Sequence, residues 1–224
     1  EKHWKVDLGK YKVWKLPVAK RPSGWNVGKS GGGVFKIISV GRLVKWKAYN
    51  FGIINAAKRL QDYGLQFEWS IWGTGPIKDD LRCSIDKLSL QDSIFLEGSL
   101  NYEDFESVVK RADIFVGMGT SALEASMLGV PTILAVDNIS DFTCGYLHDA
   151  PGECIGEVFE GMLLKEFDEF IIKHLRMKDD EITEVSAKCR AAAIRKSSTM
   201  EEIADSLDTH HYQKTRLIVC IIAE

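Results

Sequence analysis

A glycine-rich segment near the middle of the chain carries residue types suited to holding phosphate. Residues 112–135 read ADIFVGMGTSALEASMLGVPTILA, where an apolar run precedes Gly117 and Gly119, then Thr120 and Ser121. This order predicts a buried strand, a turn and a helix with Thr120 or Ser121 as its N-cap. A helix start behind glycines presents free N–H groups and partial positive charge, which suit phosphate oxygens. A plain strand–helix turn with a capping threonine is the alternative.

Glu124 lies one helical turn beyond that expected helix start. A carboxylate does not hold phosphate, but it accepts hydrogen bonds from sugar hydroxyls, as an acidic residue does for ribose in other nucleotide sites. N–H groups that donate to phosphate, next to a carboxylate that accepts from ribose hydroxyls, indicate a ligand in which a diphosphate is attached to a ribose. The alternative is a surface glutamate without a ligand.

Two cations follow the first regular strand of the chain. Arg42 comes two residues after this strand, and Lys47 stands five residues later. Arg42 is expected at the carboxyl edge of a sheet, and Lys47 in the first turn of the next helix, reaching back over the same crevice. Together they could clamp a diphosphate and stabilise it as it leaves. The alternative is that both are ordinary surface cations, since Lys45 lies equally near the end of the strand in sequence.

The elements that must position these residues alternate between strands and helices. Such alternation is typical of βαβ units and predicts an α/β fold, a Rossmann-like parallel sheet flanked by helices. Loops that follow the strands then gather along one edge, where open α/β sheets bind ligands. The expected strands are 35–40, 67–72, 93–96 and 113–116 and a second apolar strand that ends the segment 112–135; the expected helices are 47–63, 77–88 and 102–111.

The chain of 224 residues divides into three predicted parts. They are a leading segment with a flexible glycine- and serine-rich linker (1–33), the Rossmann-like domain (34–208) and a C-terminal tail (209–224). A loose alternation through Tyr11, Val13 and Leu16 indicates an edge strand in the leading segment. Later in the domain, residues 136–157 are expected to be loop, and helices are expected at 158–177, 181–195 and 200–207. The apolar run 217–222 is too short to cross a membrane.

Composition and charge limit the class of protein. A hydrophobic fraction of 45% and a net charge of −3 are those of an ordinary soluble protein. Five cysteines without a CxxC pair favour reduced thiols over a disulfide or zinc site, and with no signal-peptide pattern they predict a cytoplasmic protein. The first 50 residues hold 12 basic and 2 acidic residues, a net of +10. That end could steer phosphates or lipid head groups at the inner membrane face, or be a solvated basic face.

Four segments in series resemble one enzyme family. IISVGRLVKWK, IWGTGP, IFLEGSL and the segment 112–135 are similar to the C-terminal domain of two-Rossmann (GT-B) glycosyltransferases, above all the group-1 (family-4) set, over about residues 34–135. The resemblance implies the donor-binding half of a hexosyltransferase. Such an enzyme moves a sugar from a nucleotide diphosphate-sugar to a glycan, lipid or other acceptor, as in polysaccharide biosynthesis. It works without a bound metal or other cofactor, and no nucleic acid is expected as a partner.

The resemblance also implies a contact for each residue that matches the family's motifs. The catalytic pair is Arg42 and Lys47, which bind the diphosphate. The loop backbone at Leu100 contacts the base, and Glu124 binds the ribose hydroxyls. The phosphates are bound by Gly119, Thr120 and Ser121.

The chain departs from the family in ways that matter for activity. Members usually carry a glutamate near the transferred sugar, eight residues before Glu124, where this chain has Val116. Ala48 replaces a frequent glycine after the lysine, which is a mild change. The chain before Val34 is too short for the N-terminal Rossmann domain, which normally binds the acceptor. The isolated chain is therefore expected to be a fragment that is inactive without that domain.

Other hypotheses stay open at this point. A nucleotide-sugar 2-epimerase would use the same fold, a non-catalytic module would bind nucleotide-sugars without turnover, and an unrelated α/β module would bind simple phosphates. Residues 24–30, GWNVGKS, hint at a P-loop but fail in spacing and context. His148 could be a catalytic base, although a loop histidine is more often solvated. His210 and His211 need further ligands to bind a metal, and Trp25 and Trp46 could meet a sugar or lipid.

Overall fold

The computed structural model describes residues 15–18, 33–158, 160–199 and 202–203. Over residues 34–135 it contains every strand and helix expected from the sequence, with ends that differ by a few residues. Among the described residues, no helix is long and apolar enough to span a membrane. Several features singled out in the sequence lie outside the described residues: the segment 24–30, Trp25, His210, His211 and the run 217–222.

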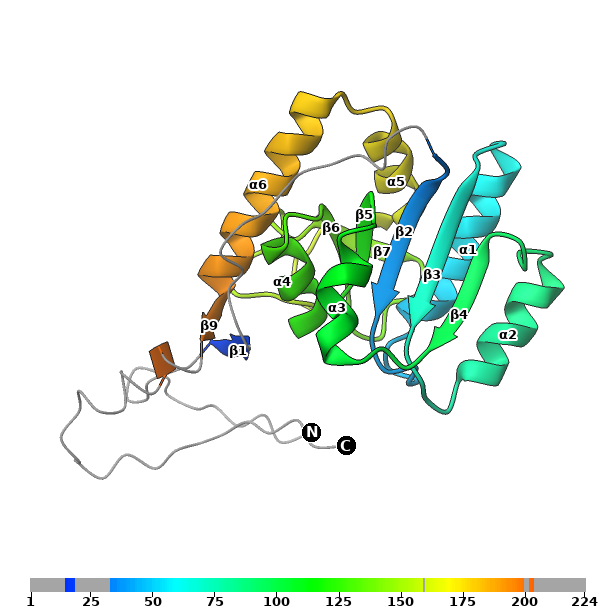
Figure 1. Cartoon of the computed structure of the whole chain (residues 1–224), viewed down its shortest axis with the longest axis horizontal. Coiled ribbons are helices and arrows are strands. Elements are labelled where there is room, and N and C mark those ends of the chain that lie inside the picture. Colours follow the sequence, from blue (N-terminus) through cyan, green and yellow to red (C-terminus); the bar gives the residue numbers. More distant parts are fainter. Residues whose placement is uncertain (1–14, 19–32, 159, 200–201, 204–224) are drawn as a thin grey trace.

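A seven-stranded sheet forms the centre of the domain (Figure 1). The first five strands in the spatial order below are parallel, whereas β7 runs antiparallel to β6 and β8 antiparallel to β7. The predicted Rossmann-like sheet is therefore confirmed, with an antiparallel edge added to it. In spatial order the strands are β4 (Ile94–Gly98), β3 (Phe67–Trp72), β2 (Phe35–Val40), β5 (Ile114–Gly117), β6 (Thr132–Ala135), β7 (Phe142–Tyr146) and β8 (Lys165–Glu166).

Helices cover both faces of this sheet. α1 packs against α2 and α5, and α4 packs against α6. Figure 1 shows α3 and α4 in front of the sheet and α1 behind it. The helix expected over 158–177 is shorter than predicted, since only α5 forms there, and the helix expected at 200–207 falls mostly outside the described residues. The helices are α1 (Tyr49–Asp62), α2 (Lys78–Lys87), α3 (Tyr102–Val109), α4 (Thr120–Met127), α5 (Phe167–Leu175) and α6 (Asp179–Lys196).

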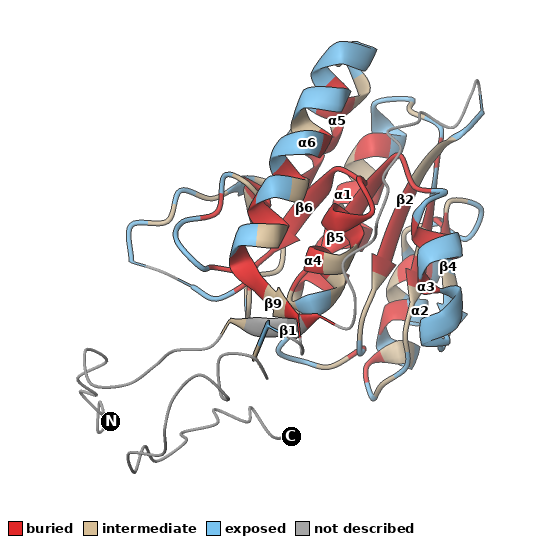
Figure 2. Cartoon of the chain, turned by 60° about the vertical axis from the view of Figure 1, so that its left-hand side comes forward, coloured by how far each residue is buried: buried red, intermediate tan, exposed pale blue. Residues whose placement is uncertain are grey.

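The central strands are the most deeply buried part of the molecule. Every residue of β5 and β6 is buried, as expected for parallel strands covered on both faces (Figure 2). Their sequences, IFVG and TILA, are almost wholly apolar for this reason. The buried Trp69 ring of β3 satisfies its one donor by hydrogen bonding to the hydroxyl of Ser39 on β2, 3.0 Å away. These packed strands give the loops at their carboxyl ends a rigid base.

The expectation of a loop over residues 136–157 is wrong in part, because β7 lies within it. Its sequence, FTCGY, shows no continuous apolar run, and its burial is mixed. The strand exists because its backbone pairs with the edge of β6, and the hydroxyl of Thr143 donates to the carbonyl of Leu134, 2.6 Å away. Pairing with a distant strand therefore decides the structure of this segment.

A small second sheet joins the two ends of the described chain. β1 (Leu16–Val18) pairs in parallel with β9 (Ser197–Thr199), which follows α6 directly. Of the residues 11–16 for which a strand was expected, Leu16 begins β1, whereas Tyr11 and Val13 lie outside the described residues. Val18 is 1% exposed, and β1 packs on α4. This part of the leading segment therefore lies on the body of the domain.

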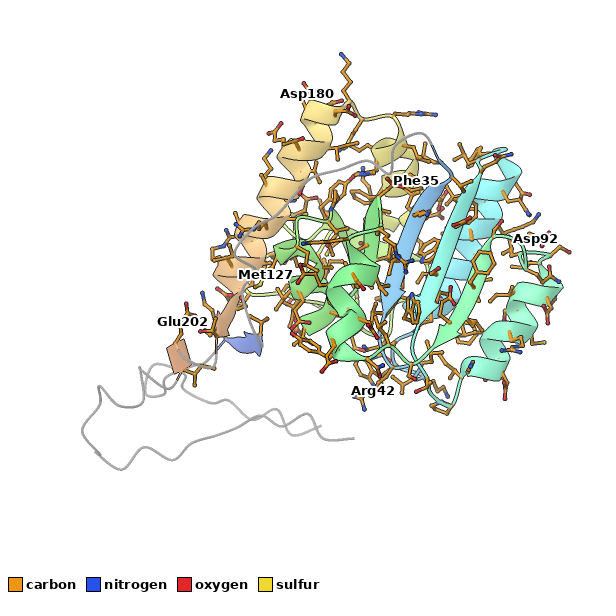
Figure 3. The ribbon with its side chains drawn as sticks, viewed as in Figure 1. Phe35, Arg42, Asp92, Met127, Asp180 and Glu202 are labelled. Carbon is orange, nitrogen blue, oxygen red and sulfur yellow. The ribbon has the colours of Figure 1, made fainter. Side chains whose placement is uncertain are left out.

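The order of the strands reverses at one place in the large sheet. The chain moves from β2 outward to β3 and β4, and then returns to the other side of β2 as β5 and β6. In open α/β sheets, ligands bind beyond the carboxyl ends of the strands at such a switch point. Figure 3 labels Arg42 beyond the arrowhead of β2, at this end of the sheet.

Candidate functional site

A hydrogen bond joins the two sides of the switch point. The hydroxyl of Ser121, in the first turn of α4, donates to the carbonyl oxygen of Val40, the last residue of β2, at 2.9 Å; the carbonyl of Met118 lies 3.2 Å from the same hydroxyl. Since α4 follows β5, this bond fixes the start of α4 beside the end of β2. The segments that carry Arg42 and Gly119 therefore lie next to each other, as the sequence predicted.

The start of α4 has the backbone geometry of an anion site. Gly119 is the N-cap residue, with φ 70°, a left-handed conformation that glycine adopts without steric cost. Neither Thr120 nor Ser121 is the N-cap, so that expectation is wrong, because Ser121 gives its hydroxyl to Val40 instead. The first N–H groups of a helix have no acceptor within the helix. Those of α4 begin at Thr120, which is exposed at the carboxyl edge of the sheet.

Two cations lie together on the other side of the switch point. Arg42 is exposed, whereas Lys47 is half-buried, with its ammonium 5.4 Å from the centre of the Trp46 ring. A Cβ added at Gly41 would lie 3.0 Å from the Lys47 Nζ, so the ammonium sits over the Gly41 backbone. Burial, and then the charge of Arg42, lower the pKa of Lys47 below its ordinary value of 10.5. No ion pair of either cation is found among the described residues, and two like charges near each other favour the binding of an anion.

The glycines of the turn after β3 allow the loop that carries these cations to pack closely against that turn. A Cβ at Gly73 would lie 1.9 Å from the carbonyl oxygen of Gly41, and one at Gly75 would lie 2.2 Å from that of Leu43. The backbone N–H of Leu43 donates to the carbonyl of Thr74 at 2.9 Å. These two glycines are therefore needed for close backbone packing. The turn lies at the predicted crevice, and its glycines support the residues 41–43.

Glu124 lies one turn along α4 and is linked to the loop after β4. The hydroxyl of Tyr102, the first residue of α3, donates to Glu124 Oε1 at 3.1 Å. Leu100, two residues before Tyr102, is half-buried and packs against the core. The predicted ribose and base residues thus meet through a side chain that the sequence analysis did not single out. Tyr102 carries no local signal of this role, since Glu124 lies 22 residues away in sequence.

The loop after β6 is hydrogen bonded to the segment that carries Trp46 and Lys47. The backbone N–H of Asn138 donates to the carbonyl of Trp46 at 2.9 Å, and that of Asp137 donates to the carbonyl of Gly156 at 2.7 Å. Asn138 has φ 56°, a left-handed conformation that asparagine tolerates. Trp46, a candidate for sugar or lipid contact, is 36% exposed and is held here beside Lys47.

Two other positions singled out in the sequence lie at different places in the sheet. Val116, where the related family carries a glutamate, is fully buried in β5, and two residues, Met118 and Gly119, separate β5 from α4. His148 follows β7, where the N–H of Leu147 donates to the carbonyl of Thr132 at the start of β6. His148 therefore lies at the amino-terminal edge of the sheet, opposite the crevice.

The surroundings of His148 are those of a structural residue. Its ring stacks on Tyr146 with an interplanar angle of 6°, and its Nδ1 lies 3.4 Å from the Cys189 sulfur. Burial lowers the pKa of His148, although the charge of Asp149, 3.4 Å from its Nε2, opposes this shift. The histidine packs β7 against α6, so it is half-buried and in contact with other residues, and is not the solvated loop histidine that the sequence favoured.

The arrangement at the switch point has one consistent chemical reading. The loop that carries the two cations lies beside the N-terminus of α4, and the carboxylate of Glu124 lies one turn further along that helix. Donors of this kind bind phosphate oxygens, and the carboxylate binds hydroxyl groups. A model of the family described as "Glycosyl transferases group 1" matches residues 26–146, just over half of the chain. The chain belongs to this family. Its group-1 fold therefore accounts for the four sequence segments that indicated it.

Relatives and solved structures agree with this assignment. The amylovoran biosynthesis glycosyltransferase AmsK of Erwinia amylovora is 31% identical over 99 residues, which are 44% of this chain and 24% of that protein. The chain spans about a quarter of the length of the curated relatives it matches.

Among solved structures, a TarM mutant from S. aureus, in complex with fondaparinux, alpha-GlcNAc-glycerol and UDP, has a TM-score of 0.59 and 17% identity over 90% of this chain and 40% of that one. HepE from Anabaena, in complex with UDP and glucose, has a TM-score of 0.57 and 17% identity over 79% of this chain and 49% of that one. Both similarities show the fold.

Proposed function

We propose that this chain is the donor-binding half of a group-1 glycosyltransferase and holds a nucleotide diphosphate-sugar at the switch point. The observation that carries this proposal is the meeting of the Arg42–Lys47 pair with the start of α4, joined through the Ser121–Val40 hydrogen bond. A diphosphate would relieve the repulsion between the two cations and accept bonds from the N–H groups of α4. A simple phosphate-binding module would not need the carboxylate of Glu124 beside that site.

Each group contributes to a different part of the donor. Arg42 and Lys47 bind the diphosphate and stabilise the charge that develops when the sugar leaves. Thr120 and Ser121 bind it through backbone N–H groups, and Thr120 adds its exposed hydroxyl. Gly119 shapes the turn before them, while its own N–H donates to the carbonyl of Ile155 at 2.7 Å. Glu124 accepts the ribose hydroxyls, and the loop around Leu100 contacts the base. We infer that the two cations and the helix N-terminus do the work that a metal ion does in other transferases.

The names of related proteins and the ligands in their structures support a nucleotide-sugar as donor. The TarM structure holds UDP and alpha-GlcNAc-glycerol, the HepE structure holds UDP and glucose, and AmsK is named for amylovoran biosynthesis. On this basis we propose that the donor carries a hexosyl group and that the acceptor is a glycan or a lipid-linked glycan. A second Rossmann domain, supplied by sequence outside this chain, would bind the acceptor. The chain alone is then expected to bind donor without turning it over.

A binding screen tests this proposal. The chain is titrated with UDP-, GDP- and ADP-glucose and with inorganic phosphate, and its melting temperature is followed, since a ligand stabilises by the logarithm of its concentration over Kd. We expect one nucleotide-sugar to raise the melting temperature far more than phosphate does. The double variant Arg42→Ala/Lys47→Ala should lose that shift, and Lys87→Ala, an exposed lysine at the far end of α2, should keep it. No shift with any of the three nucleotide-sugars, or an equal shift in the double variant, would overturn the proposal.

A further inference from the structure

Tyr102 stands where the two halves of the proposed nucleoside pocket meet. It is the first residue of α3, two residues after Leu100, and its side chain is 60% exposed. Its hydroxyl donates to Glu124 Oε1 on α4 at 3.1 Å. An exposed aromatic side chain usually has no fixed orientation. The hydrogen bond from Tyr102 to a partly buried carboxylate is therefore a specific feature of this site.

The Tyr102 ring is held from below by the core. It stacks on Phe105 with ring centres 6.4 Å apart and an interplanar angle of 16°, and Phe105 is 8% exposed. The contact with Phe105 and the hydrogen bond to Glu124 both restrict the rotation of the ring. Burial, then the charge of Glu124 and the hydrogen bond to it, raise the pKa of Tyr102 above 10.0. The phenol is therefore protonated, and able to donate, near neutral pH.

A hydrogen bond of this kind sets the orientation of the carboxylate that accepts it. An ionised glutamate offers about four acceptor directions on two oxygens, and each hydrogen bond that it accepts restricts the rotation of its side chain. The bond from Tyr102 to Oε1 is one such restraint on Glu124. A preorganised acceptor does not lose rotational freedom when the ligand binds, and this saving appears as affinity.

We propose that Tyr102 is a positioning residue for ribose recognition, which orients the carboxylate of Glu124 and thereby ties the base-contacting loop to the ribose-binding helix. The inference rests on the proposed function, since it assigns Glu124 to the ribose. It adds that the preference for ribose over deoxyribose depends on Tyr102. A site built to bond a hydroxyl discriminates against the analogue without it only while its acceptor is held in place.

Calorimetry with matched ligands and matched variants tests this. Wild type, Tyr102→Phe and Tyr63→Phe are each titrated with UDP, GDP and ADP and with their 2′-deoxy counterparts. Tyr63 is the control, being 68% exposed just after the end of α1. We expect Tyr102→Phe to lose about two- to tenfold in affinity for the ribonucleotide, as for one side chain newly immobilised on binding. Its affinity for the deoxyribonucleotide should hardly change, and Tyr63→Phe should match wild type for both.

The outcomes separate this inference from the proposed function. If wild type binds none of the three ribonucleotides, the proposed function fails and the inference fails with it. If wild type binds one of them and Tyr102→Phe keeps the same ratio of ribo- to deoxyribonucleotide affinity, the inference alone is wrong. An equal loss for both ligands with a lower melting temperature would also overturn it, since that result describes a residue needed only for folding.

Discussion

The hydroxyl of Ser121 and the carbonyl oxygen of Val40 lie 2.9 Å apart, and their hydrogen bond spans the point where the strand order of the sheet reverses. Val40 is two residues before Arg42, and Ser121 is two residues after Gly119. The bond therefore fixes the relative position of the two segments proposed to hold a diphosphate. Its loss should be felt both in stability and in binding.

Ser121→Ala tests this link. The change leaves the Val40 carbonyl without its side-chain donor, so the free energy of unfolding should fall by about 1 kcal/mol. Affinity for the bound nucleoside diphosphate should fall as well, because the start of α4 is less firmly held. The measurements are denaturant unfolding and calorimetry. Ser84→Ala is the control, since its hydroxyl bonds to a carbonyl in its own helix α2. Equal effects in the two variants would count against a special role for Ser121.

Lys47 gives the binding of the diphosphate a pH dependence. Its pKa in the unliganded domain lies below 10.5, so it loses its proton at a lower pH than an ordinary lysine. Only the protonated ammonium attracts phosphate. Affinity for UDP, or whichever diphosphate binds, should therefore decline as the pH is raised through this lowered pKa. Lys47→Arg, which stays charged, should remove most of the decline, and titrations over a range of pH values measure both; an unchanged decline would exclude Lys47 as its source.

Protonated Lys47 should lower the free energy of unfolding of the domain when no ligand is bound. Its pKa is lowered in the folded state, so folding disfavours the protonated form, and this cost is complete below the folded pKa. The cost disappears as the pH rises from that value to the ordinary 10.5. Lys47→Met should therefore raise the free energy of unfolding near neutral pH, and the gain should shrink at alkaline pH. Lys87→Met provides the exposed control, and a gain that does not depend on pH would contradict the charge explanation.

Glu124 should contribute strongly to the affinity for ribonucleotides. Removing a hydrogen bond to a charged group costs about 1.5–3 kcal/mol, which is roughly a 10- to 100-fold loss in affinity. We expect a loss in this range for Glu124→Ala by calorimetry. Glu103→Ala, an exposed glutamate in the first turn of α3, is the control. Unchanged affinity in Glu124→Ala would refute the ribose role.

Gly52→Ala tests the close packing of α1 against the loop after β6. Alanine in a helix is normally favoured over glycine by about 1 kcal/mol. At this position, however, a Cβ would lie 1.7 Å from the carbonyl oxygen of Ser140. We expect the clash to reverse the sign and destabilise the domain by about 2 kcal/mol in denaturant unfolding. Gly33→Ala, where a Cβ meets nothing within 4 Å, should have little effect.

Much of the fold could be predicted because its central strands are locally distinctive. The runs in β5 and β6 are apolar since both faces are covered, and the glycines around them predict the turns. β7 could not be predicted in this way, because only its pairing with the edge of β6 makes it a strand. The N-cap of α4 was missed for a similar reason, since the Ser121 hydroxyl bonds to a residue 81 positions away.

The candidate site follows the same division. The expected positions of Arg42, Lys47 and Gly119 depend on the ends of parallel strands, which the alternation of strands and helices predicts. The contact between Tyr102 and Glu124 depends on where the start of α3 lies relative to α4, and no spacing in the sequence indicates it. Sequence patterns therefore identified the edge where a ligand is proposed to bind, but not the contact between side chains that is proposed to orient Glu124.

The central claim is that one diphosphate bridges the end of β2 and the start of α4. Backbone amide NMR spectra of the chain, recorded while the best-binding of UDP, GDP and ADP is added, test it most directly. The account predicts that the largest shifts occur at Gly119, Thr120 and Ser121 and at Gly41 and Arg42, while the amide of His148 at the opposite edge stays unchanged. Shifts gathered at another surface, or at only one of these two segments, would contradict it.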